Sequence, residues 1–165
     1  MEELSSKLMN NPDLELVSLK AAVEAQMKKK EFEQALINAN KAFEVRQDLY
    51  WVIESAFNLR AKAEDWEGAL QVLNSGFKKK LIPAEKYKLL KAVTLYELAE
   101  NAKQSGDSVN FFKYCSQALE CDPQLVPAAL ALAEYYVQND NQTRKAANVL
   151  SNIWRRNPTT EIAKF

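Results

Sequence analysis

The residues best suited to acid–base chemistry are two pairs of carboxylates, Glu97 with Glu100 and Glu31 with Glu33. General acid–base catalysis needs such a pair to converge in a cleft with shifted pKa values. Three residues apart on a helix, Glu97 and Glu100 more simply form a solvated face. The chain has no histidine, which excludes Ser-His-Asp and Cys-His nucleophiles, and its three scattered glycines cannot build a phosphate loop. We therefore expect no catalytic residues and no enzyme.

The two cysteines, Cys115 and Cys121, are the next candidates for chemistry. Six residues apart on a helix, they point about 240° away from each other, so neither a disulfide nor a closed zinc site is expected. Because histidine and cysteine are the ordinary axial ligands of haem, a haem site would depend on these cysteines, a methionine or a tyrosine. The sequence predicts no metal site and no cofactor.

The overall charge argues against a nucleic-acid partner. Lys plus Arg total 22 and Asp plus Glu total 22, giving a net charge of zero, whereas phosphate contacts demand a basic surplus. No apolar run reaches the roughly 18 residues of a membrane span, so we expect no span in this chain and a soluble chain as given. Lysine runs at 28–30 and 78–80 fall at expected helix ends, where the helix dipole favours cations. Contact with an anionic membrane or an acidic partner is the alternative.

The elements that must position these residues follow from an internal repeat. Residues 30–36 align with residues 64–70, an offset of 34 residues, which is the tetratricopeptide period. The second helix of each repeat places small or apolar residues four and then three positions apart. Four segments keep this spacing: Ala35, Ala39 and Ala42; Ala69, Leu73 and Gly76; Phe111, Cys115 and Ala118; and Ala146, Leu150 and Ile153.

The repeat predicts an all-α fold, a tetratricopeptide-like right-handed superhelix of about four antiparallel helical hairpins. After an N-terminal tail at 1–12, a single domain over 13–165 should hold hairpins at about 13–46, 49–80, 84–121 and 124–156. The expected helices are 13–29, 31–46, 49–62, 65–79, 84–104, 108–121, 124–138 and 142–156. One interval exceeds the period by eight residues, so the helix that begins near Pro83 should be the longest, running to about Gln104.

Several segments of the second half extend beyond a generic repeat. They are AEDWEGAL at 63–70, LIP at 81–83, KAVTL at 91–95, DPQLVPAA at 122–129, RKAA at 144–147, WRRNP at 154–158 and EIA at 161–163. In these segments the chain resembles the C-terminal region of the HemY family, bacterial tetratricopeptide proteins associated with haem biosynthesis. The family usually has a histidine near Pro158, where this sequence has Asn157 and Thr159. Because family members carry two N-terminal membrane helices, the resemblance implies the soluble part of a protein anchored in the bacterial inner membrane.

A binding surface is expected where the first helices of the hairpins line the concave face. By repeat geometry the residues that face it are Lys20, Glu24, Met27, Trp51, Glu54, Asn58, Lys62, Tyr96, Glu100, Lys103, Glu134 and Gln138. This mixture of charges, amides and aromatics suits a protein or peptide partner. The other large aromatics, Phe32, Trp66, Phe111 and Trp154, are expected in the core.

The leading hypothesis is a non-catalytic protein–protein interaction scaffold that organises haem-biosynthesis proteins at the bacterial inner membrane. Its interaction half rests on the repeat, because stacked hairpins expose a long binding surface. Its haem half rests on the resemblance. The alternative is a generic tetratricopeptide adaptor for envelope or secretion assembly with no link to haem. The sequence leaves the partner's identity, the side of the membrane and the oligomeric state open.

Overall fold

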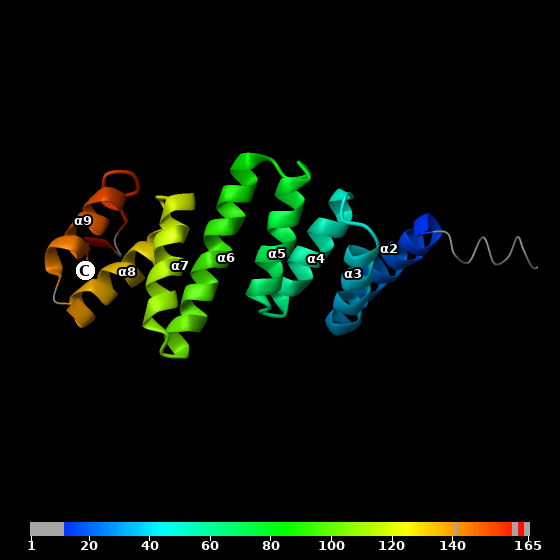
Figure 1. Cartoon of the computed structure of the whole chain (residues 1–165), viewed down its shortest axis with the longest axis horizontal. Helices are drawn as coiled ribbons and strands as arrows, with labels where there is room; N and C mark the ends of the chain where they lie inside the picture. The colour runs from blue at the N-terminus through cyan, green and yellow to red at the C-terminus, as the bar shows by residue number, and fades with distance from the viewer. Residues whose placement is uncertain (1–11, 141, 160–161, 164–165) are drawn as a thin grey trace, which may run out of the picture. The chain divides into compact units, whose positions relative to one another are not determined.

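The computed structural model describes residues 12–140, 142–159 and 162–163, and it is helical in every regular segment of those residues (Figure 1). Its helices are α2 (Pro12–Lys29), α3 (Phe32–Val45), α4 (Tyr50–Lys62), α5 (Trp66–Lys78), α6 (Ala84–Gln104), α7 (Ser108–Cys121), α8 (Val126–Asp140) and α9 (Thr143–Trp154). The expected tail at 1–12 lies outside the described residues except for Pro12, which begins α2.

The chain forms two compact units, residues 1–83 and residues 84–165. In the first unit α2 packs on α3, α3 on α4, and α4 on α5. In the second unit α6 packs on α7, α7 on α8, and α8 on α9. Consecutive helices therefore pair as antiparallel hairpins within each unit. The expectation of one domain over 13–165 concerns both units together and stays a prediction.

The helix after Pro83 has the length that the interrupted repeat predicts. It begins at Ala84, ends at Gln104 and is the longest described helix at 21 residues. The eight extra residues therefore lengthen the first helix of a hairpin, and the prediction is confirmed.

The repeated small and apolar positions form the contacts between helices. Ala35, Ala39 and Ala42 on α3 have no exposed surface, and the corresponding residues of α5, α7 and α9 are buried or, for Leu150, half-buried. Among the aromatics expected in the core, Phe111 is buried, and Phe32 and Trp66 are half-buried.

The prediction that Trp154 lies in the core is wrong, because this residue is 44% exposed. Ile153 takes the inward position of α9 with an exposed fraction of 1%. One residue further along a helix, Trp154 points about 100° away from that direction. The spacing of the repeat selects Ile153 for the core and leaves Trp154 outside it.

Four helices end in the same turn, although only one of the turns has a glycine. Lys30, Glu64, Lys80 and Gly106 have positive φ angles of 63°, 59°, 59° and 75°. In each turn the next residue's N–H donates to a carbonyl five residues back, as Asp65 does to Arg60 at 3.0 Å. This is the Schellman pattern, whose left-handed residue is usually glycine because side chains are strained there.

Replacing Glu64 by glycine is expected to stabilise the first unit by about 1 kcal/mol, because it removes this strain. The matched control is Glu67→Gly in the first turn of α5, which should destabilise by about 0.5–1 kcal/mol through lost helix propensity and a lost acidic residue near the helix N-terminus. Urea denaturation followed by circular dichroism measures both changes. Destabilisation by Glu64→Gly would show that its side chain contributes more than its backbone strain costs.

Candidate functional site

The residues predicted to face the groove fall in both units. Lys20 and Glu24 on α2, and Trp51, Glu54, Asn58 and Lys62 on α4, belong to the first unit. Tyr96, Glu100 and Lys103 on α6, and Glu134 on α8, belong to the second. That these two sets form one surface stays a prediction.

In the first unit, the predicted residues engage aromatic and polar neighbours. The Nζ atom of Lys20 lies 5.9 Å from the ring centroid of half-buried Trp51, and that of Lys62 lies 3.8 Å from the ring of Phe32. The Tyr50 hydroxyl donates a hydrogen bond of 2.9 Å to Oε1 of Glu54. Glu24 and Asn58 are exposed. Two lysines of the predicted surface therefore lie against aromatic rings within the first unit.

In the second unit, the predicted residues of α6 lie near the buried thiol of Cys115. Burial, together with the charge and hydrogen bond of Glu100, raises the pKa of the Tyr96 hydroxyl to about 12. Burial and the charge of Glu100 also raise the pKa of the Cys115 thiol to about 12, with the charge of Lys103 opposing the rise. Both groups are therefore protonated at neutral pH, and neither supplies an anionic nucleophile or ligand.

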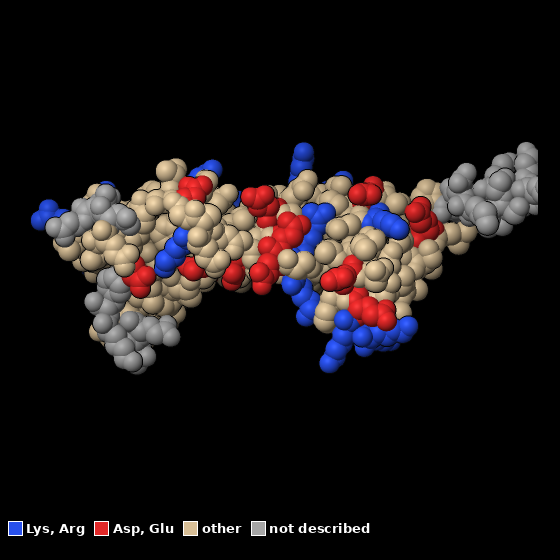
Figure 2. Space-filling model, turned by 90° about the horizontal axis from the view of Figure 1, so that it is seen from below, with Lys and Arg blue, Asp and Glu red and all other residues tan. Residues whose placement is uncertain are grey.

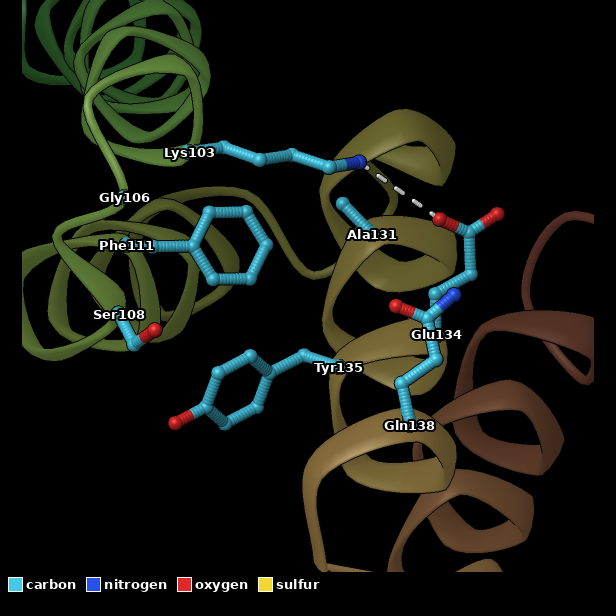
Figure 3. A pocket seen from close by; sticks show the side chains of 8 residues that line it. All are labelled: Lys103, Gly106, Ser108, Phe111, Ala131, Glu134, Tyr135 and Gln138. Carbon is cyan, nitrogen blue, oxygen red and sulfur yellow. Dashed lines mark ion pairs between the residues drawn. The ribbon is translucent and has the colours of Figure 1, made fainter.

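A pocket of about 110 Å³ lies between α6, α7 and α8 (Figure 3). It is lined by Lys103, Gly106, Ser108, Phe111, Ala131, Glu134, Tyr135 and Gln138. The four α8 residues are spaced by three, one and three positions, so they share one helix face. The two aromatic rings and Ala131 make the apolar part of the pocket, and the charged and amide groups stand around it.

The turn between α6 and α7 sets the position of the pocket wall. Gly106 reverses the chain with a φ of 75°, and the Asp107 side chain caps α7 by accepting a hydrogen bond of 3.0 Å from the Asn110 N–H. This bond also lowers the pKa of Asp107, because it favours the ionised carboxylate. With α7 started at Ser108, the Phe111 ring lies one turn in and points toward α8 (Figure 3).

The charged residues of the pocket form an open ion pair. The Nζ of Lys103 lies 3.7 Å from Oε2 of Glu134, and the two side chains are 52% and 46% exposed. The same Nζ lies 6.0 Å from the Phe111 ring centroid. The rings of Phe111 and Tyr135 are 5.5 Å apart at a tilt of 43°, which is ordinary aromatic packing. The pair is accessible to a ligand because water reaches both of its members.

The structure brings Lys103, Glu134 and Gln138 together, all three of which repeat geometry places on the predicted face. Sequence reasoning missed Tyr135, Ser108 and Ala131 as lining residues and assigned Phe111 to the core alone. The signal for the α8 residues was present, since Ala131, Glu134, Tyr135 and Gln138 share one face. No comparable signal existed for Ser108, whose place depends on the turn before it.

The two lysine runs lie at helix ends. Lys28 and Lys29 close α2 and Lys78 closes α5, and all six lysines of the runs are exposed. Figure 2 shows Lys and Arg side chains gathered at one edge of the first unit, with acidic side chains beside them. The positions agree with helix termination, and the alternative of an anionic partner stays open.

The residues that the structure describes contain neither a membrane span nor a metal-binding cluster. None of their helices has the length and apolar character needed to cross a bilayer. Nor do three His, Cys, Asp or Glu side chains of these residues come together in a group that could hold a metal ion.

We expect the chain not to retain haem. Cys115 has no exposed surface and a thiol pKa of about 12, so it is a poor thiolate ligand. Mixing the chain with haemin and separating the two by gel filtration should leave no Soret absorption in the protein peak. The contrary result would be a Soret band that stays with the protein and disappears when Cys115 and Cys121 are both replaced by alanine.

The helical hairpins, their buried small residues and their repeat define an all-α tetratricopeptide-like fold, which confirms the predicted fold class. Among solved structures the chain is similar to MamA, with a TM-score of 0.54 and 12% identity over 99% of this chain and 87% of that one. It is also similar to the MamA RS-1 ArsTM double mutant, with a TM-score of 0.50 and 16% identity over 93% and 90% of the two chains. A MamA segment from Desulfovibrio magneticus RS-1 gives a TM-score of 0.50 and 16% identity over 91% and 79%.

These identities show a shared fold alone. No protein-family model matches the chain. No curated protein matches it either.

Proposed function

We propose that the chain is a non-catalytic interaction module that binds a protein or peptide partner on its first helices. In the second unit the proposed contact is the pocket between α6, α7 and α8. In the first unit it is the face of α2 and α4 that carries half-buried Trp51 and the exposed residues Lys20, Glu24, Glu54, Asn58 and Lys62. The pocket is the observation that carries the proposal.

The pocket has the composition of a recognition site for one side chain. Its apolar part is made by Phe111, Tyr135 and Ala131, and its charged groups, Lys103 and Glu134, remain in water. Binding energy in protein interfaces concentrates in a few anchors that enter such pockets, with polar groups around them. Cys115, which packs with Phe111 and Ala131 in the core, is buried and protonated, so it offers the pocket no thiolate.

The partner we propose is a haem-biosynthesis protein at the bacterial inner membrane, with the parent of this chain anchored there. The support is the resemblance to the HemY family in residues 63–70, 122–129 and 144–158. The generic adaptor for envelope or secretion assembly shares the same binding surface, so the identity of the captured proteins decides between the two.

Affinity capture of the parent protein from bacterial membranes tests both halves of the proposal. The matched variant is Glu134→Lys, which turns the open ion pair into two like charges without touching a buried residue. We expect haem-biosynthesis enzymes to be enriched with the wild type and lost with this variant. Circular dichroism should show that both proteins are equally helical.

Two results would count against the proposal. Enrichment of envelope or secretion proteins instead would contradict the haem half and leave the interaction half standing. An unchanged set of proteins with Glu134→Lys would mean that the pocket is not the contact.

A further inference from the structure

Three charged side chains of α6 and α8 lie at or beside the pocket. Glu134 lines it, and Glu100 lies close enough for its charge to act on the same buried thiol as that of Lys103. Tyr96, Glu100 and Lys103 follow each other at spacings of four and three on α6, so they share a face of that helix. Lys103 and Glu134 balance each other in the lining, and Glu100, which stands outside the lining, adds a surplus of one negative charge nearby. A cationic ligand is therefore the better electrostatic match for this face.

The ammonium group of Lys103 lies where such a ligand would bind, but its contacts there are long. Its Nζ lies 3.7 Å from Glu134, whereas a charge-assisted hydrogen bond measures about 2.7–2.9 Å. It lies 6.0 Å from the Phe111 ring centroid, at the outer limit of about 6 Å for a cation over an aromatic face. Figure 3 shows its side chain reaching across from α6 toward Glu134 on α8, past the Phe111 ring.

We propose that the pocket binds the arginine side chain of a basic segment in the protein partner, and that Lys103 competes with it from within the chain. Glu134 is the counter-charge, and the half-buried Tyr135 ring, with the buried Phe111 ring packed against it, is the surface on which the guanidinium stacks. This inference rests on the proposed function and names the chemistry of its partner.

Size and shape favour arginine. A cavity of about 150 Å³ takes benzene, so a pocket of about 110 Å³ fits a smaller planar group. A guanidinium is planar, stacks on aromatic faces and can bond a carboxylate through two N–H groups, whereas an ammonium is a compact, strongly hydrated point charge. An arginine can therefore use the rings and the carboxylate together, while Lys103 only reaches both at long distance.

The competing ligand chemistry is a carboxylate that binds Lys103. For a variant that lacks the Lys103 charge, this alternative predicts the opposite change in affinity. Removing the Lys103 charge should strengthen the binding of an arginine, because a competitor is lost and Glu134 is freed. The same change should abolish the binding of a carboxylate.

The test uses the chain and three capped pentapeptides, acetyl-Ala-Leu-X-Leu-Ala-amide, in which X is Arg, Gln or Glu. Binding is followed by NMR titration of the backbone amide signals of Gly106, Ser108 and Ala131, which line the pocket. The variants are Lys103→Met, which keeps an unbranched side chain without the charge, and Glu134→Gln. The matched control is Lys113→Met, an exposed α7 lysine that does not line the pocket.

We expect the arginine peptide to bind and the other two not to. Lys103→Met should tighten its dissociation constant about fivefold, Glu134→Gln should weaken it by at least about fivefold, and Lys113→Met should leave it unchanged. Weaker binding of the arginine peptide by Lys103→Met, or selective binding of the glutamate peptide, would overturn the proposal.

Equal binding of all three peptides, or of none, would overturn it as well. The proposed function fails separately, because it depends on whether Glu134→Lys changes the proteins captured from bacterial membranes. If capture depends on the pocket while the arginine peptide does not bind, the interaction module stands and its cationic ligand is wrong.

Discussion

Replacing Phe111 by alanine is expected to lower the free energy of unfolding by about 3–5 kcal/mol, the usual cost of deleting a buried aromatic ring. The Phe111 side chain is 4% exposed and packs in one cluster with Ala99, Cys115 and Leu132. The same ring forms a wall of the pocket. Alanine leaves a cavity where α6, α7 and α8 meet, so the second unit should lose most of its stability. Urea denaturation followed by circular dichroism measures the change.

The matched control lies two residues earlier on the same helix. Val109 is 78% exposed, so Val109→Ala should change the free energy of unfolding by no more than about 0.5 kcal/mol. If Phe111→Ala cost no more than Val109→Ala, the packing of α7 between α6 and α8 would be wrong.

Replacing Gly76 by valine is expected to destabilise the first unit by about 1–3 kcal/mol through overpacking. A Cβ atom at Gly76 would lie 2.6 Å from Cγ2 of Ile53 and 2.9 Å from Cδ1 of Ile82. The Ile82 atom ends a flexible side chain, but Ile53 is 1% exposed and branched at Cβ, so it has few other rotamers. The helices α4 and α5 would have to separate to admit the side chain.

The control for Gly76 is Gln71→Val, which places the same residue on an exposed position of α5. It carries the same valine helix propensity without the contact, so the difference between the two variants isolates the overlap. Thermal melts that coincide for the two variants would show that Gly76 is not needed for the close approach of α4 and α5.

The helices were largely predictable because the repeat places small residues at the positions where helices pack closely. Ala39 and Ala42 stand where helices approach closely, and both have no exposed surface. Gly76 occupies the position that is alanine in α3 and α7, and there Ile53 and Ile82 take the space. The interrupted period likewise predicted the length of α6, because the eight extra residues fall within 81–104 and Pro83 suits the start of one long helix.

The pocket was less predictable because it depends on turns and on side-chain direction. The left-handed residues Lys30, Glu64 and Lys80 carry no sequence signal, since glycine is the usual marker of that turn. The groove residues were assigned from periodicity alone, which places Lys103 and Glu134 on first helices but not their distance of 3.7 Å. Phe111 shows the same limit, because one ring serves as core and as pocket wall.

The most direct test of the interaction module is a photo-crosslink from the pocket in living bacteria that express the chain. A photoreactive phenylalanine replaces Gln138, which lines the pocket, or Glu120, an exposed residue near the far end of α7. Irradiation should join a discrete partner protein to the Gln138 variant and not to the Glu120 variant. Crosslinks from Glu120 alone, or equal products from both positions, would contradict a partner bound at the pocket between α6, α7 and α8.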